Sequence, residues 1–419
     1  MSAETSYIRQ LCGIAGRWHK FPLLFRHLGW RGALGYLARR LGRLIRGEPQ
    51  SSTPKNNVIA FYDFLIRPAR PASVEASAIP PRSMNWVIPH FEIGSGGHMT
   101  AFRMIQQLEQ RGYQCRIVLV GPSAYRNNAE LTRTIRKHFI PLTASASVGE
   151  ESLEPAEFTV ATSWETAYAV RRFADTRHKL YFVQDMEPYF YAHGSTYAFA
   201  EATYRFGFIG ITAGDWLAQL MREQYGMEAY PFGFSYDKAQ HQLKPHQPGP
   251  QRVFLYARSV TPRRGFELGL LALSLVHKAL PEVEFVLVGW DASAYEIPFK
   301  HINPGVVPAA KLPEYYQMCD AALVLSLTNL SLLPLELMAC GCPVVSNDGP
   351  NVEWQLKHED NALLAAATPE ALAAALIRLL TEEELRQRII ANGLAFAQAS
   401  DWSREGSRVH ACLEQIRSR

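Results

Sequence analysis

The sequence has little cysteine and no long hydrophobic run. Its six cysteines are scattered over 419 residues, Cys340 and Cys342 stand too close together for a disulfide framework, and none is spaced with histidine as in a zinc site. No apolar run approaches the ~20 residues that cross a bilayer, and no early apolar segment precedes a cleavage site. We therefore expect a cytoplasmic protein with reduced, buried thiols.

Extremes of composition are missing as well. Hydrophobic residues make up 47% of the chain and charged residues 20%, which is ordinary for a soluble globular protein and excludes collagen, coiled coil and disorder. At about 150 residues per domain, the length suggests two or three domains. A net charge of +4 is too small to indicate a nucleic-acid partner, and we expect none.

The basic residues are concentrated at the start of the chain. Residues 1–47 hold nine basic side chains and one acidic side chain, a net charge of +8, whereas the remainder carries −4. Leucines at helical spacing in 33–46 predict that residues 1–50 form a basic amphipathic helical segment. Two functions fit equally well: a peripheral anchor on the anionic inner face of the cell membrane, or an extra helix packed on the first domain.

The rest of the chain alternates short apolar runs with helical stretches, as β-α units do. Interrupted by the polar stretch 237–251, this rhythm predicts an α/β protein of two doubly wound, Rossmann-like domains facing a central cleft. The first spans 51–245 and is completed by a C-terminal helix at 401–419; the second spans 246–400. Predicted strands are 85–89, 116–120, 158–161, 180–184, 208–212, 253–257, 284–288, 321–325 and 343–346, and predicted helices are 99–111, 266–279, 312–318, 334–339 and much of 369–419.

The first candidate site is the turn GSGGH at 94–98, between a predicted strand and a predicted helix. The backbone amides of Gly96 and Gly97 can hold an anionic group at the start of that helix. The turn is not the dinucleotide fingerprint, because Met99 stands where the third glycine would fall, and the chain has no Walker A sequence. A tight turn without a ligand accounts for the same residues equally well.

A second candidate is the loop YARSVTPRRG at 256–265, which directly follows a predicted strand. It places the guanidinium groups of Arg258, Arg263 and Arg264 where doubly wound sheets bind ligands, and arginine bonds diphosphate oxygens bidentately. The alternative is a solvated basic loop.

The third candidate is the stretch 325–346, a strand, a polar turn and a short helix. Ser331 can cap that helix, and the amides of Leu332 and Leu333, with the helix dipole, suit a phosphate. Glu336 lies on an otherwise apolar helix and needs hydrogen-bond donors such as sugar hydroxyls. The alternative is a pairing of Glu336 with an internal arginine.

These motifs together resemble the family 4 glycosyltransferases of GT-B fold. The segments YFVQDMEPYFY at 181–191, AEATYRFGFIGITAGDWLA at 200–218 and LSLTNLSLLPLELMA at 325–339 are similar to WsaF-type dTDP-rhamnosyltransferases, and the resemblance runs from residue 85 to the C-terminus. It implies retaining transfer of L-rhamnose, or a related deoxysugar, from a dTDP-sugar donor to a growing cell-surface polysaccharide or lipid-linked glycan. It also implies that the second domain holds the donor and the first the acceptor.

By position in the family motifs, Glu336 binds the ribose hydroxyl of the donor. Arg258 and Arg264 stabilise the diphosphate leaving group, and Arg263, Ser331 and the Leu332 and Leu333 amides add donor contacts, as Gly96 and Gly97 do from the first domain. No metal or other cofactor is then needed, and no Asp-x-Asp motif occurs.

The sequence departs from the family at one position. The family often has two glutamates separated by seven residues, and Thr328 stands where the first should be. We expect Thr328 or Asn329 to bond the donor sugar instead.

Acceptor residues are expected after the predicted strand 180–184. Asp185 or Glu187 is predicted to orient or deprotonate the acceptor hydroxyl, although a helix-capping Asp and a structural Glu fit nearly as well. We assign His98, Trp164 and Tyr189 to acceptor binding by contact with sugar rings, although such residues are more often core.

Two other functions remain open at this point. The replacement of a family glutamate by Thr328 fits a catalytically weak, nucleotide-sugar-binding subunit of a polysaccharide assembly complex. A GT-B-like epimerase acting on a nucleotide sugar is the other.

Overall fold

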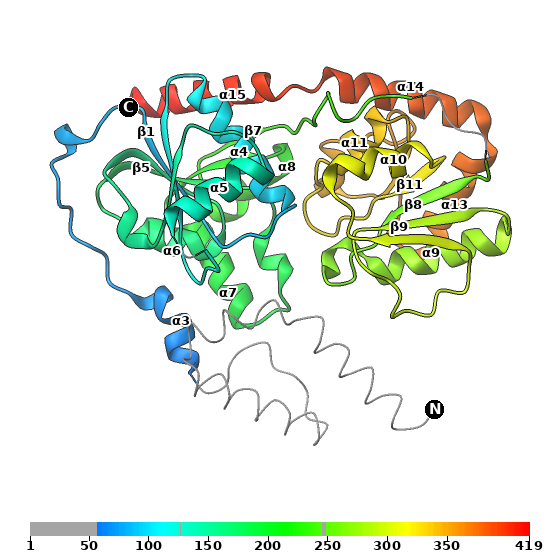
Figure 1. Ribbon diagram of the computed structural model, residues 1–419, viewed down its shortest axis with the longest axis horizontal. Coiled ribbons are helices and arrows are strands. Elements are labelled where there is room, and N and C mark those ends of the chain that lie inside the picture. Colours follow the sequence, from blue (N-terminus) through cyan, green and yellow to red (C-terminus); the bar gives the residue numbers. More distant parts are fainter. Residues whose placement is uncertain (1–56, 126, 245–248) are drawn as a thin grey trace.

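The computed structural model describes residues 57–125, 127–244 and 249–419 (Figure 1). The predicted helical segment at 1–50, with its basic residues, lies outside these residues. Two α/β domains lie side by side, and two helices at the C-terminal end of the chain run along both of them.

The first domain is built on a seven-stranded parallel sheet in the order β3-β2-β1-β4-β5-β6-β7. This order, with helices between the strands, is that of a doubly wound fold. Its strands are β1 (Ser83–Ile88), β2 (Gln114–Leu119), β3 (Ser145–Val148), β4 (Ala156–Ala161), β5 (Thr176–Val183), β6 (Ile209–Ala213) and β7 (Ala229–Phe232). Its helices are α3 (Val58–Ile66), α4 (Gly96–Glu109), α5 (Asn128–His138), α6 (Trp164–Arg172), α7 (Ser195–Ala202) and α8 (Asp215–Tyr225).

The second domain holds a six-stranded parallel sheet in the order β10-β9-β8-β11-β12-β13. Its strands are β8 (Arg252–Tyr256), β9 (Glu284–Val288), β10 (His301–Gly305), β11 (Ala321–Leu323), β12 (Val344–Asn347) and β13 (Leu363–Ala365). Its helices are α9 (Phe266–Ala279), α10 (Leu312–Gln317), α11 (Leu333–Ala339), α12 (Pro350–Glu353), α13 (Pro369–Thr381) and α14 (Glu383–Ala399).

Burial explains why most residues of the strands are apolar. Every residue of β1, β4 and β9 is buried, because a parallel sheet carries helices on both faces. The edge strands β3, β7, β10 and β13 were not predicted. All the predicted strands and helices that lie within the described residues are present, with ends shifted by a few residues.

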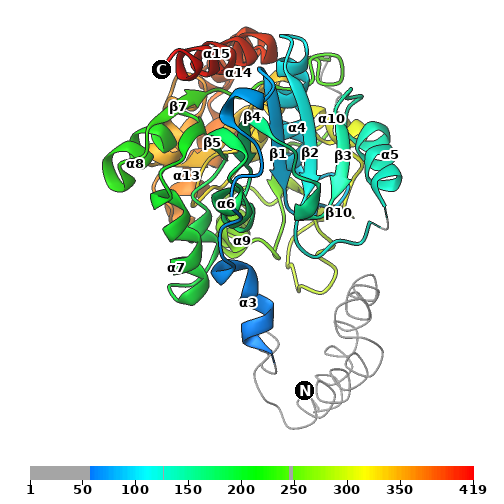
Figure 2. The same ribbon diagram turned by 90° about the vertical axis from the view of Figure 1, so that its left-hand side faces the viewer.

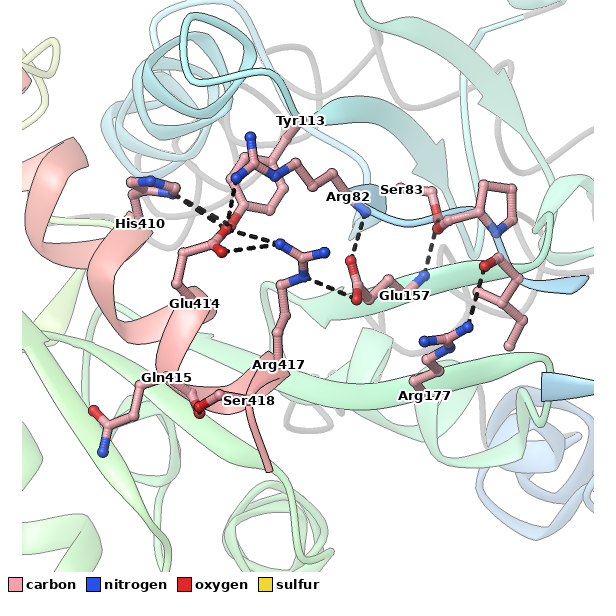
Figure 3. Close-up of polar contacts among 12 residues, drawn as sticks. Arg82, Ser83, Tyr113, Glu157, Arg177, His410, Glu414, Gln415, Arg417 and Ser418 are labelled. Carbon is pink, nitrogen blue, oxygen red and sulfur yellow. Dashed lines mark hydrogen bonds and ion pairs between the residues drawn. The ribbon is translucent and has the colours of Figure 1, made fainter. Parts of the chain in front are cut away.

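The last helix, α15 (Trp402–Arg417), returns to the first domain and packs against α4 and β7 (Figure 2). Figure 3 shows the ion pairs and hydrogen bonds between this helix and the first domain. Arg417 Nε donates to the buried carboxylate of Glu157 at 3.0 Å, at the start of β4, and Glu414 accepts from Arg82 at 3.2 Å and from Tyr113 at 3.0 Å. The chain therefore crosses between the domains twice.

No helix among the described residues is both long and apolar enough to span a membrane.

Candidate active site

The carboxyl ends of strands from both sheets meet at the boundary between the domains. Val183 of β5 pairs with Thr212 of β6, so that the following residues, Gln184 and Ala213, lie side by side. The side-chain amide of Asn329, which follows β11, donates to both of their carbonyl oxygens, at 3.0 and 2.9 Å. One side chain of the second domain thus joins two strand ends of the first.

Further contacts close the same boundary. The Asn329 backbone N–H donates to Asp185 Oδ1 at 2.7 Å, and Trp354 Nε1 donates to Asn329 Oδ1 at 2.9 Å. Gly214 has φ 88°, and a Cβ there would lie 2.6 Å from the Trp354 ring, so the close approach of the domains requires glycine. Thr328 or Asn329 is predicted to bond the donor sugar; Asn329 is 1% exposed, and its side-chain amide makes hydrogen bonds at this boundary.

The arginine loop reaches the boundary from the second domain. The guanidinium group of Arg263 lies 3.8 Å from the centroid of the Phe190 ring, and its Nε lies 3.5 Å from Asp185 Oδ2. Arg263 therefore contacts the first domain. Arg264 Nη1 donates to Ser326 Oγ at 2.9 Å, which fixes its side chain against the end of β11.

Arg258 is the least engaged of the three arginines. Its Nη1 lies 3.4 Å from the Tyr256 hydroxyl, and its buried Nε has no hydrogen-bond partner within the described residues. A buried cationic donor without a partner suits an anionic ligand, because desolvation strengthens the attraction between them.

The turn before α11 differs in detail from the prediction. The helix begins at Leu333 with Leu332 as its N-cap, and the Ser331 hydroxyl accepts from the Leu333 N–H only at 3.4 Å. The expected cap is therefore weak. The Thr328 hydroxyl is buried and has no partner among the described residues.

Glu336 lies on α11 among polar groups from other elements. Tyr316 of α10 donates its hydroxyl proton to Glu336 Oε2 at 3.3 Å, and His241 Nε2 lies 3.8 Å from Oε1. Burial raises the pKa of Glu336 to about 7, against the opposing effects of the Tyr316 hydrogen bond and the positive charge of Arg103. In the alternative given above, Glu336 pairs with an internal arginine. Arg103 of α4 lies near enough for its positive charge to act on the pKa of Glu336.

The glycine turn opens α4 as predicted. The helix begins at Gly96, the Gly97 carbonyl accepts from Gln184 Nε2 at 3.0 Å, and Ser95 Oγ lies 2.8 Å from His98 Nδ1. The turn therefore lies against the end of β5. Burial lowers the pKa of His98 to about 4, so its ring is neutral near pH 7.

Two of the predicted acceptor residues are part of the interior. Glu187 Oε2 accepts from the Trp164 N–H and its Oε1 from the Tyr181 hydroxyl, both at 2.8 Å, and burial raises its pKa to about 8. Trp164 is 4% exposed and donates from Nε1 to Tyr191. Both side chains are buried. Trp164 is the first residue of α6, and Glu187 accepts a hydrogen bond from its backbone N–H. Tyr189 is 47% exposed and is free to contact a ligand.

Sequence reasoning missed several residues that surround Glu336 and Asn329: Arg103, Asp237, His241, Tyr316 and Trp354. His241 lies in the polar stretch 237–251, and no periodic pattern there signals that it is buried.

No group of three or more His, Cys, Asp or Glu side chains in 57–125, 127–244 or 249–419 is placed to hold a metal ion. Metal-independent chemistry stays a prediction.

Solved structures of the same architecture include sucrose-phosphate synthase from Thermosynechococcus elongatus, with a TM-score of 0.63 and 14% identity over 80% of this chain and 99% of that chain. Anabaena HepE in complex with UDP-glucose has a TM-score of 0.60 and 17% identity, covering 80% of this chain and 99% of that chain. At these identities the likeness shows the fold.

Family models match each domain separately. The model described as "WsaF, N-terminal domain" matches residues 84–212, and "Glycosyl transferases group 1" matches residues 237–396. The chain thus joins a WsaF N-terminal domain to a group 1 glycosyltransferase domain. The group 1 match includes the arginine loop, His241 and Glu336, and the WsaF match includes the glycine turn and Asp185.

Among curated relatives, the chain is 33% identical over 393 residues to the O-antigen biosynthesis protein RfbC of Myxococcus xanthus. The match covers 88% of this chain but spans only 30% of the length of that relative.

Proposed function

We propose that the protein is a retaining glycosyltransferase that moves L-rhamnose from dTDP-L-rhamnose to a growing cell-surface polysaccharide or lipid-linked glycan. The observation that carries the proposal is the arrangement after β8 and β11, where Arg258, Arg264 and Glu336 lie in one group 1 domain. The similarity to an O-antigen biosynthesis protein supports the polymer, and the sugar is inferred from the resemblance of the sequence motifs to WsaF-type rhamnosyltransferases.

The second domain holds the donor in this proposal. HepE, which shares the fold, has been solved with UDP-glucose. Glu336 accepts a hydrogen bond from the nucleoside sugar, and the guanidinium groups of Arg258 and Arg264 bind the diphosphate. Arg263 supports this loop from its contacts with Asp185 and Phe190.

The chemistry is the exchange of one bond at the anomeric carbon. The bond to the diphosphate oxygen breaks with its electron pair, and the acceptor oxygen forms the new bond on the same face of the sugar. Negative charge accumulates on the leaving diphosphate, where two fixed guanidinium groups stabilise it most in the transition state. The acceptor hydroxyl loses its proton, and Asp185 is the proposed base because its carboxylate is partly exposed at the domain boundary, whereas Glu187 is buried with both oxygens hydrogen-bonded.

A membrane-bound acceptor is consistent with the surface of α3. Its side chains Val58, Ile59, Phe61 and Ile66 are 47 to 77% exposed, an unusual apolar face directly after the basic N-terminal residues. We propose that this part of the chain contacts anionic lipid, and removal of residues 1–47 should abolish sedimentation with phosphatidylglycerol vesicles.

The test of the activity is transfer itself. The purified protein is incubated with a lipid-linked glycan and dTDP-L-rhamnose, UDP-glucose or GDP-mannose, and the product is examined by mass spectrometry and by NMR of the anomeric proton. We expect transfer from dTDP-L-rhamnose with the anomeric configuration of the donor, and loss of transfer in Arg264→Ala. Inversion, transfer from another donor only, or isomerisation of the donor without acceptor would overturn the proposal.

A further inference from the structure

A buried histidine faces Glu336 from the segment between the two domains. His241 is 4% exposed, and its Nδ1 lies 3.2 Å from the carbonyl oxygen of Asp237. Because a carbonyl oxygen can only accept, Nδ1 carries the hydrogen, and Nε2 of the neutral ring holds a lone pair. That Nε2 has no hydrogen-bond partner among the described residues and lies 3.8 Å from Glu336 Oε1.

The same ring packs on the other group that holds Glu336. The His241 and Tyr316 rings are stacked with centroids 6.0 Å apart and planes 20° apart, and the Tyr316 hydroxyl donates to Glu336 Oε2. Tyr236 meets the His241 ring edge-on at 6.2 Å. The histidine therefore cannot turn away from the carboxyl group without disturbing both tyrosines.

A proton on either His241 Nε2 or Glu336 Oε1 stabilises the contact between these two atoms. An ionised carboxylate opposite a lone pair is repulsive, whereas one proton on either group makes the contact attractive. Burial lowers the pKa of His241 and raises that of Glu336 to about 7, so the two groups compete for one proton near neutral pH.

Other titratable groups around the pair act on the same balance. They come from α4, from the segment between the domains, from α10 and from α11: Arg103, Tyr236, Asp237, Tyr316 and Cys340. Arg103 favours the ionised carboxylate and Asp237 disfavours it, and these two form an ion pair at 3.7 Å.

We propose that His241 is a positioning residue that takes the proton of Glu336 and holds the resulting carboxylate ready to accept a hydrogen bond from a sugar hydroxyl of the bound nucleotide. This inference rests on the proposed role of Glu336 in donor binding. An ionised carboxylate accepts a hydrogen bond from a sugar hydroxyl more strongly than a protonated carboxyl group does, so nucleotide binding favours loss of the proton from Glu336, and His241 is the buried group beside it.

Nucleotide affinity should therefore depend on pH in a way that requires His241. In His241→Asn the shorter amide can keep the bond to the Asp237 carbonyl but removes Nε2, so Glu336 alone must lose its proton. We expect dTDP and UDP to bind about tenfold more weakly than to the parent at pH 6.0, since one pKa unit corresponds to a factor of ten, and within about twofold of it at pH 8.5.

Two further variants separate positioning from folding. His241→Gln, whose longer amide can donate where Nε2 stood but cannot take a proton, should bind as the parent does at pH 8.5 and stay weaker than the parent at pH 6.0. His277→Asn, which changes a histidine near the far end of α9, should leave the pH profile as in the parent. An equal loss of affinity at both pH values in His241→Asn would overturn the proposal.

A measurement without nucleotide keeps this inference distinct from the proposed function. The ring nitrogens of His241 are titrated by NMR in the parent and in Glu336→Gln, where the carboxylate is gone. We expect the titration midpoint of His241 to fall by about one unit or more in Glu336→Gln. An unchanged midpoint with normal nucleotide binding overturns the role of His241 alone; failure of the parent to bind any nucleotide overturns the proposed function and the role of the pair together.

Discussion

At the scale of single residues, the site is defined by carboxyl groups in different surroundings. Asp185 lies at the domain boundary beside Arg263, Glu187 is enclosed by hydrogen-bond donors, and Glu336 is buried beside a histidine. Acidic residues close in sequence, such as Asp185 and Glu187, therefore lie in different surroundings. The spacing of acidic residues indicated where to look but not which one was accessible.

The buried Glu187 predicts a dependence of stability on pH. Its pKa in the folded protein is about 8, above the ordinary 4.5, so the folded state binds the proton more tightly than the unfolded state. Its effect on the free energy of unfolding is therefore most favourable below pH 4.5 and is lost as the pH rises toward 8. Glu187→Gln removes this loss while an amide oxygen still accepts from the Trp164 N–H.

Urea unfolding at pH 5.0 and pH 8.5 measures this effect. Over this interval we expect the free energy of unfolding of the parent to fall by on the order of 3 kcal/mol relative to that of Glu187→Gln. Parallel changes in the two proteins would show that Glu187 is ionised in the folded state.

At the scale of secondary-structure elements, α15 is held to the first domain by a buried apolar face and by a small number of charged contacts. Arg417 faces the carboxylate of Glu157, which is buried at the start of β4 (Figure 3). Arg419, two residues later, pairs with Glu228, and both of those side chains are about half exposed. The chain thus contains a buried and an exposed ion pair close together.

Arg417→Met should lower the free energy of unfolding by about 2 kcal/mol, because it leaves a buried carboxylate with fewer donors. Arg419→Met should change it by less than about 0.5 kcal/mol. Urea unfolding of both variants at pH 7 measures the difference, and equal effects would contradict the assignment of α15 to the first domain through this contact.

Much of the architecture could be predicted at this scale because the parallel strands are buried on both faces and therefore mostly apolar. Strands β3, β7, β10 and β13 were missed because each is short and lies at or near an edge of its sheet, where polar residues such as His301 interrupt the apolar run. The arginine loop and α11 were predicted because arginine, glycine and an isolated glutamate stand out from apolar surroundings.

The contacts between the domains could not be predicted in the same way. Asn329, Trp354 and His241 have neighbours more than a hundred residues away or across the domain boundary. No local pattern encodes such contacts. The sequence therefore predicts that Thr328 or Asn329 bonds the donor sugar, and it leaves His241 within the polar stretch 237–251 without a role.

At the scale of the whole molecule, Asn329 joins the domains. Its side chain makes three hydrogen bonds, two of them to strand ends of the first domain. In Asn329→Ala we expect the two domains to unfold in separate calorimetric transitions, whereas the parent unfolds in one.

Asn303 is the matched control, because its side chain also makes three hydrogen bonds, all within the second domain. Asn303→Ala should lower the melting temperature without separating the transitions. A single transition in Asn329→Ala would contradict the role of this residue in coupling the domains.

The central claim is that the second domain binds the nucleotide of a sugar donor through Glu336, and isothermal titration with dTDP, UDP and GDP at pH 7.5 tests it most directly. The account predicts that dTDP binds the parent most tightly and that Glu336→Gln, which keeps the size of the side chain, weakens dTDP binding at least about tenfold, as expected for the loss of a charged hydrogen-bond acceptor. Binding of dTDP with equal affinity to both proteins, or to neither, would contradict it.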